Sequence, residues 1–120
     1  MKLLNNYLSA SGLAAACEAV LIGRAFGLDP DLMADVFNGS TGKNNATEVK
    51  LKQHVNSGKF AAGFAMGLMA KDLTLARKLA GDMQIDAKGL DACQALFARA
   101  VEELGEGADH TEVIKLIEPR

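Results

Sequence analysis

The chain has 120 residues, and its 13 basic and 15 acidic side chains leave a net charge of −2. This balance argues against a surface that neutralises phosphate groups, so we expect no nucleic-acid partner. Hydrophobic residues make up 49% of the chain, which is enough for one packed core and excludes a disordered chain. The length argues against a complete oxidoreductase, because a nucleotide-binding domain and a substrate domain together need roughly twice as many residues.

The N-terminal segment and the two cysteines bear on where the protein works. The first residues contain one basic side chain, Lys2, and no small-residue cleavage site, which is unlike a signal peptide. The longest nearly apolar stretch, residues 13–23, is shorter than the ~20 residues of a membrane-spanning helix, so we expect no membrane partner. Cys17 and Cys93 lie in apolar surroundings and cannot form a disulfide framework. We therefore expect reduced core thiols and a cytoplasmic protein.

The first predicted element is a helix over residues 2–26, because no proline interrupts this segment and Gly27 supplies a C-terminal stop. Between Lys2 and Arg24 the only charged residue is Glu18, so the helix is apolar or small on nearly every side. Such a helix is typically covered by neighbours on most sides. We expect it to be the axis of a helical domain and part of a subunit interface.

Two further helices are predicted in the first half of the chain. An N-cap aspartate and a first-turn proline begin a short helix over residues 30–37, and a loop rich in glycine and serine follows it. A third helix is expected over residues 46–55, where Glu48 and Lys52 have the i,i+4 spacing of a favourable ion pair.

Three helical segments are predicted in the second half of the chain. The fourth and fifth helices are expected over residues 61–80 and 87–104, where apolar residues recur with helical spacing. A final short helix is expected over residues 113–117. Asp109 and Glu112 resemble a capping box in front of it.

No strand-like alternation or hairpin turn occurs in the sequence, so we expect one all-α domain over residues 1–120. It should be built around one long buried helix with about five further helices or helical turns. His54 and His110 have no second ligand at metal-binding spacing, so we expect no metal site and place both on the surface. Gly63 and Gly67 are predicted to form a small-residue ridge on the fourth helix.

Two lysines at the edges of apolar runs are the candidate functional residues. Lys2, Asn5 and Asn6 share one face of a helix, because they are spaced i, i+3 and i+4. An ammonium beside two amides can hold an oxygen-rich small molecule, although a solvated N-terminal lysine has the same spacing. Lys71 ends an uncharged stretch and precedes Asp72. It either faces a polar cleft or extends its ammonium to solvent.

These residues resemble two elements of the β-hydroxyacid dehydrogenase family, which includes 3-hydroxyisobutyrate dehydrogenase, tartronate semialdehyde reductase and, more distantly, 6-phosphogluconate dehydrogenase. Residues 2–6, KLLNN, are similar to its Lys-x-x-Asn-Asn element, and residues 60–64 and 68–76 are similar to its second helical element. The resemblance covers essentially the whole chain. The ordered pair of elements, with their two lysines 69 residues apart, makes it fairly specific.

The resemblance implies a helical C-terminal domain of the 6-phosphogluconate dehydrogenase-like type, which binds substrate and dimerises. It also implies an N-terminal Rossmann domain that binds NAD or NADP and is absent from this chain, as are the family's glycine-rich turn and Ser-Gly-Gly element. The full-length protein is expected to transfer hydride between the nicotinamide and a small 3-hydroxy acid or semialdehyde, as a homodimer or higher homo-oligomer. The isolated chain is expected to be inactive and to bind no cofactor tightly.

The resemblance also implies roles for individual residues. Lys2 matches the family's catalytic lysine, which gives a proton to the carbonyl oxygen in reduction and takes the hydroxyl proton in oxidation. The other matches are the substrate-binding residues Asn6, Asn5 and Phe64 and the cofactor-binding residues Lys71 and Asp72.

Two hypotheses without catalysis stay open. A stand-alone helical module could dimerise through its first and last helices and bind no substrate, which the neutral first helix also fits. A small lipid or acyl carrier would fit the methionines and phenylalanines, although at helical spacing these are more often core residues. The coding sequence upstream of Met1 separates the module from the dehydrogenase, because an in-frame Rossmann unit there favours the dehydrogenase.

Overall fold

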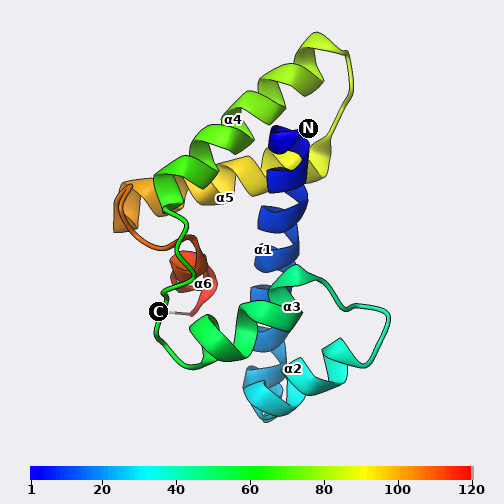
Figure 1. Ribbon diagram of the computed structural model, residues 1–120, viewed down its shortest axis with the longest axis vertical. Coiled ribbons are helices and arrows are strands. Elements are labelled where there is room, and N and C mark those ends of the chain that lie inside the picture. Colours follow the sequence, from blue (N-terminus) through cyan, green and yellow to red (C-terminus); the bar gives the residue numbers. More distant parts are fainter. Residues whose placement is uncertain (120) are drawn as a thin grey trace.

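The structure is a computed structural model that describes residues 1–119, and its elements are all helical. In chain order they are α1 (Lys2–Phe26), α2 (Pro30–Asn38), α3 (Asn45–Val49), η1 (Leu51–Asn56), α4 (Met66–Asp82), α5 (Lys88–Leu104), η2 (His110–Val113) and α6 (Ile114–Ile117). The first half of α1 is crossed by the α4–α5 pair, and its second half by α2 and α3 (Figure 1). The all-α class is confirmed.

Local signals determine the C-terminal end of α1 and the start of α2. Gly27 adopts a left-handed conformation (φ 102°), and its N–H donates to the carbonyl of Arg24 at 3.0 Å, which closes α1 as predicted. The Asp29 carboxylate accepts a hydrogen bond from the N–H of Leu32 at 3.0 Å, and Pro30 occupies the first turn of α2.

α1 is the axis of the domain, but this chain covers only one side of it. Its inward face is buried against the other helices, through Ala10, Leu13, Ala14, Ala16, Cys17, Val20 and Gly23. Its outward face leaves Leu8 70%, Ile22 72% and Phe26 84% exposed. By length and composition α1 could also cross a membrane, yet a core helix meets the same test, and here its inward face is the centre of the domain.

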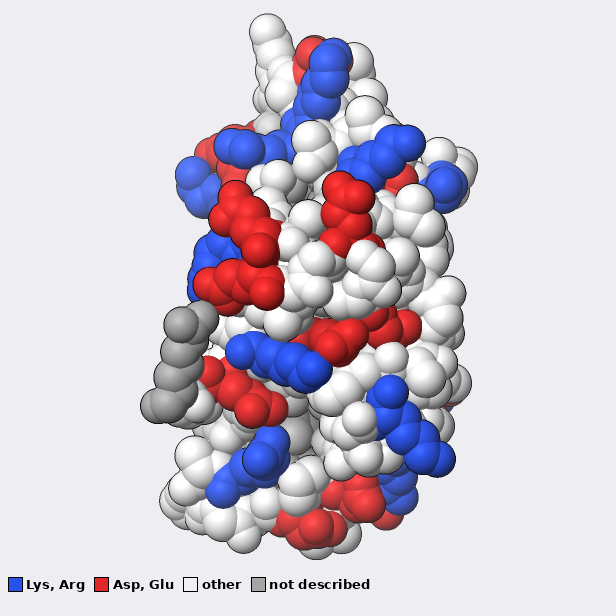
Figure 2. All heavy atoms as spheres, turned by 90° about the vertical axis from the view of Figure 1, so that its left-hand side faces the viewer, with Lys and Arg blue, Asp and Glu red and all other residues white. Residues whose placement is uncertain are grey.

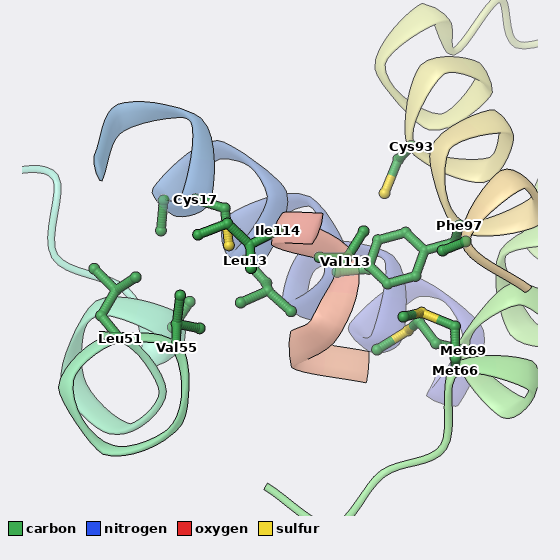
Figure 3. Close-up of a cluster of buried hydrophobic side chains, with 14 of the residues drawn as sticks. Leu13, Cys17, Leu51, Val55, Met66, Met69, Cys93, Phe97, Val113 and Ile114 are labelled. Carbon is green, nitrogen blue, oxygen red and sulfur yellow. The ribbon is translucent and has the colours of Figure 1, made fainter. Parts of the chain in front are cut away.

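The core joins the two halves of the chain across α1. Leu13 and Cys17 from α1 meet the fully or nearly fully buried side chains of η1, α4, α5 and the C-terminal segment (Figure 3). The other labelled members are Leu51, Val55, Met66, Met69, Cys93, Phe97, Val113 and Ile114. Burial raises the pKa of Cys17 to about 12 and that of Cys93 to about 11, so both thiols stay protonated and inert at neutral pH.

The third predicted helix is not one α-helix. It divides into α3 and the π-helix η1, and the carbonyl of Lys50 at their junction accepts hydrogen bonds from the N–H groups of both His54 and Val55. The predicted ion pair between Glu48 and Lys52 is wrong, because Lys52 pairs instead with Asp35 on α2 at 2.5 Å. Glu48 pairs with Lys43 at 3.5 Å, so each member of the predicted pair has another partner.

The fourth helix begins at Met66, five residues later than predicted, because the segment before it is held by tertiary hydrogen bonds. The N–H of Gly63 donates to the Asp109 carboxylate at 2.8 Å, and the N–H of Met66 donates to the carbonyl of Ala108 at 2.6 Å. Gly63 has a left-handed backbone (φ 97°) that a helix does not allow. It therefore lies outside α4, and the predicted glycine ridge on this helix is wrong.

The surface carries charges of both signs. On the face shown in Figure 2, acidic and basic side chains lie close to one another over much of the surface. This mixture matches the small net charge of −2.

Candidate functional site

Two predicted site residues from distant parts of the sequence meet where α4 crosses α1. The Asn6 amide on α1 donates a hydrogen bond to Asp72 Oδ2 on α4 at 2.6 Å. The Asp72 side chain is only 8% exposed. A buried carboxylate with a short amide donor is a fixed negative charge, and it holds the Asn6 amide in one orientation.

Lys2 lies beside this pair, one helical turn from Asn6. Its Nζ is 4.0 Å from Asp72 Oδ2, and its side chain is 77% exposed. The ammonium therefore faces open space while it remains close to a buried anion. Asn5 lies next to them, is exposed, and donates to the Asn6 side-chain oxygen at 3.4 Å. The structure thus brings Lys2, Asn6 and Asp72 together, with Asn5 at the rim.

A hollow of about 250 Å³ opens beside Asn6. Its lining residues are Asn6, Ser9, Lys50, Ala62, Phe64, Met69 and His110. Phe64 is thus in the wall of the hollow that Asn6 borders. Four of these seven residues have polar side chains and three have apolar ones, a composition that suits a small polar molecule with a carbon chain.

His110 is a buried part of this wall, so its predicted surface location is wrong. It is 2% exposed, its Nδ1 lies 3.2 Å from the carbonyl oxygen of Phe64, and the two rings make an edge contact at 5.7 Å. Burial, and then the nearby positive charge of Lys50, lower the pKa of His110. The ring is therefore neutral at pH 7. His54, also predicted on the surface, is half-buried.

Lys50 and Ser9 are pocket residues that the sequence analysis missed. The Lys50 ammonium donates to Ser9 Oγ at 3.2 Å, and the residue is 8% exposed. Burial lowers the pKa of Lys50, and the negative charge of Asp109 partly opposes this effect. Ser9 had a detectable signal, because it lies seven residues after Lys2 and three after Asn6, on the same helical face.

Lys71 lies in a second hollow, although Asp72 follows it directly in the sequence. This hollow, about 640 Å³ in volume, lies between the start of α4 and the turn after α5, and its lining residues are Ala65, Gly67, Leu68, Lys71, Glu106 and Gly107. Consecutive side chains on a helix point about 100° apart, so Lys71 and Asp72 face different sides of α4. Asp72 faces the Lys2 and Asn6 side, and Lys71 the side of Glu106.

The sequence and fold match known dehydrogenases. Residues 1–117 match the family model described as "NAD-binding of NADP-dependent 3-hydroxyisobutyrate dehydrogenase". Among curated proteins, the chain is 41% identical over 76 residues to 2-(hydroxymethyl)glutarate dehydrogenase of Eubacterium barkeri, a match that spans 63% of this chain and 25% of that protein.

Solved structures give the same result over almost the whole chain. A 3-hydroxyisobutyrate dehydrogenase from Salmonella typhimurium superposes with a TM-score of 0.88 and 26% identity, over 96% of this chain and 40% of that one. The protein Psf3, in complex with NADP+ and 2-OPP, superposes with a TM-score of 0.85 and 27% identity, over 98% of this chain and 40% of that one. The chain thus spans well under half the length of these relatives. It belongs to the 3-hydroxyisobutyrate dehydrogenase family of β-hydroxyacid dehydrogenases.

Proposed function

We propose that this chain is the helical substrate-binding and dimerisation domain of an NAD(P)-dependent 3-hydroxyacid dehydrogenase, with Lys2 as the proton donor and acceptor. The observation that supports this most strongly is the convergence of Lys2 and Asn6 on α1 with the buried Asp72 on α4. Family membership supplies the reaction class.

The chemistry divides between the cofactor and the residues of this chain. A bound nicotinamide would supply the hydride acceptor for oxidation and the hydride donor for reduction. In oxidation the neutral Lys2 amine takes the hydroxyl proton, and in reduction the ammonium gives it to the carbonyl oxygen. Asp72, 4.0 Å away, stabilises the ammonium that forms. Asn6 has a second amide hydrogen for a substrate oxygen, because Asp72 uses only one.

Lys71 and Glu106 fit a place beside the cofactor. Within residues 1–119 the Lys71 ammonium forms no ion pair, and Glu106 borders the same hollow. One donor and one acceptor suit the amide and hydroxyl groups of a nicotinamide riboside better than they suit a diphosphate. Lys71 and Glu106 do not distinguish NAD from NADP, since neither residue contacts a 2′-phosphate in this proposal.

We also propose two protein partners, an N-terminal Rossmann domain and a second copy of the chain. The high exposure of Lys2 leaves room for another domain over the site. An apolar groove of about 500 Å³ between α1 and α2 carries the exposed side chains of Ile22, Leu32 and Val36, which suits a subunit contact. The unbridged buried thiols suit a reducing compartment, so we place the protein in the cytoplasm.

The groove would serve a stand-alone dimerisation module equally well, so oligomeric state does not separate the two functions. Enzyme activity does. The full-length protein that contains this chain should reduce NAD+ or NADP+ in the presence of a small 3-hydroxy acid, followed by the absorbance of the reduced nicotinamide.

The Lys2→Met variant should lose about 100-fold or more in kcat, because general acid–base catalysis contributes 10²–10⁴-fold. It should still bind the cofactor, as measured by nicotinamide fluorescence. Lys43→Met is the control, because Lys43 is exposed in the loop after α2. The next residue, Asn44, lies beside Gly12 in the middle part of α1, about 15 Å along the helix from Lys2. Turnover by Lys2→Met at the control's rate would remove Lys2 from the reaction.

A further inference from the structure

The buried ammonium of Lys50 has no counter-ion in contact with it. It donates to Ser9 Oγ at 3.2 Å and is 8% exposed, and within residues 1–119 no carboxylate oxygen lies within 4.0 Å of it. An ammonium has three hydrogens to donate, and the hydroxyl of Ser9 takes one. Buried charges in proteins are normally paired, so this group is short of an anionic acceptor.

The carboxylate that acts on Lys50 from nearby, that of Asp109, already accepts three other hydrogen bonds. The oxygens of Asp109 accept from the N–H of Gly63 at 2.8 Å, from the N–H of Thr111 at 3.1 Å and from the Thr111 hydroxyl. These bonds cap η2 and tie residues 60–65 to the C-terminal segment. Asp109 therefore has a structural role and influences Lys50 only from a distance.

The position of Lys50 is set by an unusual backbone. The π-helix η1 begins directly after it, and its carbonyl accepts hydrogen bonds from both His54 and Val55. Single π-turns are rare and often occur at functional sites. From this position the Lys50 side chain reaches α1 and donates a hydrogen bond to Ser9.

Lys50 also lines the hollow that Asn6 borders. Lys2, Asn6 and Ser9 are spaced i, i+4 and i+7 along α1, so they form a row about 10 Å long on one face. A molecule that reacts beside Lys2 can thus extend along this row to Lys50. Phe64 and Met69 supply apolar walls for the chain of carbon atoms between the two ends.

We infer that Lys50 binds a second carboxylate of the substrate, at the end remote from the reacting carbon, so that the enzyme acts on hydroxy diacids in preference to hydroxy monoacids. This inference rests on the proposed function of the site. A single cation with a hydroxyl beside it matches the one negative charge of a carboxylate. It is too little for a phosphate dianion, which commonly requires further cations or backbone donors.

The test compares matched substrates in the full-length enzyme. The diacids 2-(hydroxymethyl)succinate and 2-(hydroxymethyl)glutarate are paired with the monoacids 2-(hydroxymethyl)butanoate and 2-(hydroxymethyl)pentanoate, which have a methyl group in place of the second carboxylate. The neutral monoamide of the glutarate, with the amide at the remote end, separates charge from shape. For each substrate kcat/KM is measured from the absorbance of the reduced nicotinamide.

The wild-type enzyme should prefer each diacid to its matched monoacid by about 10- to 100-fold, the range expected for a hydrogen bond to a charged group. In Lys50→Met this ratio should fall to near one, and the monoamide should no longer be worse than the diacid. Lys52→Met, an exposed lysine of the same segment, should keep the wild-type ratio. Since the ratio is taken within one variant, a smaller folded fraction does not change it.

Three results would overturn the inference. A wild-type preference for the monoacids excludes an anion site in the pocket. A diacid preference that survives in Lys50→Met assigns the second carboxylate to another group. An enzyme that oxidises none of these hydroxy acids refutes the proposed function itself, and the inference falls with it, an outcome distinct from the first two.

Discussion

The hydrogen bond between Asn6 and Asp72 should stabilise the fold measurably, because it joins α1 to α4 through two residues that are 66 positions apart in the sequence. A bond to a charged group contributes about 1.5–3 kcal/mol. Asn6→Ala removes the donor, and within residues 1–119 it leaves the buried carboxylate of Asp72 with only Lys2. The ammonium of Lys2 is on a side chain that is 77% exposed, so it adds little, on the order of 0–1 kcal/mol. We expect Asn6→Ala to lower the free energy of unfolding by about 2 kcal/mol.

The assay is a double-mutant cycle by urea unfolding at pH 7, followed by far-ultraviolet circular dichroism. Asn6→Ala, Asp72→Ala and the double variant should give a coupling energy of about 1.5 kcal/mol or more. Asn5→Ala is the matched control, because Asn5 is exposed on the same turn, and it should change stability by less than about 0.5 kcal/mol. If the two single effects add within about 0.5 kcal/mol, the bond does not organise the site and the reasoning is wrong.

Three further predictions concern packing, thiol reactivity and pH. In thermal unfolding, Gly67→Ala should destabilise the protein by about 1–3 kcal/mol, because a Cβ there would meet Glu106 Cβ at 2.9 Å. Gly81 is on the same helix, and a Cβ there would meet nothing within 4 Å. Gly81→Ala should therefore stabilise the protein by about 0.5–1 kcal/mol. Burial raises the pKa of Cys17 from 9.0 to about 12, so its alkylation at pH 8, followed by mass spectrometry, should be about 1,000-fold slower than that of an unperturbed thiol. Burial lowers the pKa of His110 below 6.5, so its contribution to stability is present above pH 6.5 and is lost as pH falls toward the lower folded-state pKa. The urea midpoint should decline over that range in the wild type and stay flatter in His110→Gln, and equal slopes would contradict this.

The parts of the fold that local sequence determines were predictable. A glycine in the left-handed conformation ended α1, and an aspartate cap with a first-turn proline began α2. The capping box of Asp109 and Glu112 formed as its spacing suggested. Each of these signals acts within four residues, so it can be recognised without knowledge of the rest of the fold.

The segment before α4 could not be predicted in the same way. Its residues have the composition of a helix, but hydrogen bonds to a segment 46 residues away hold them in another conformation, as the contact of Gly63 with Asp109 shows. The partners of that contact are set by the tertiary fold and leave no periodic pattern in the sequence.

The candidate site, like the fold, could be predicted only where local spacing determines it. The i,i+4 spacing placed Lys2 and Asn6 on one face, but only the packing of α4 across α1 showed that Asp72 joins them and Lys71 does not. Lys50 was missed because a lysine that lies between the charged residues Glu48 and Lys52 is typically a surface residue. Its burial depends on Ser9, 41 residues earlier in the chain.

The central claim is that Lys2 exchanges a proton with the substrate between α1 and α4. The most direct measurement is a crystal structure of the full-length protein with NAD+ or NADP+ and a bound hydroxy acid. The account predicts the substrate hydroxyl about 2.6–3.2 Å from Lys2 Nζ, with the Asn6 amide on a substrate oxygen and Phe64 against its carbon chain. A substrate bound away from α1, with the Lys2 side chain directed into solvent, would contradict it.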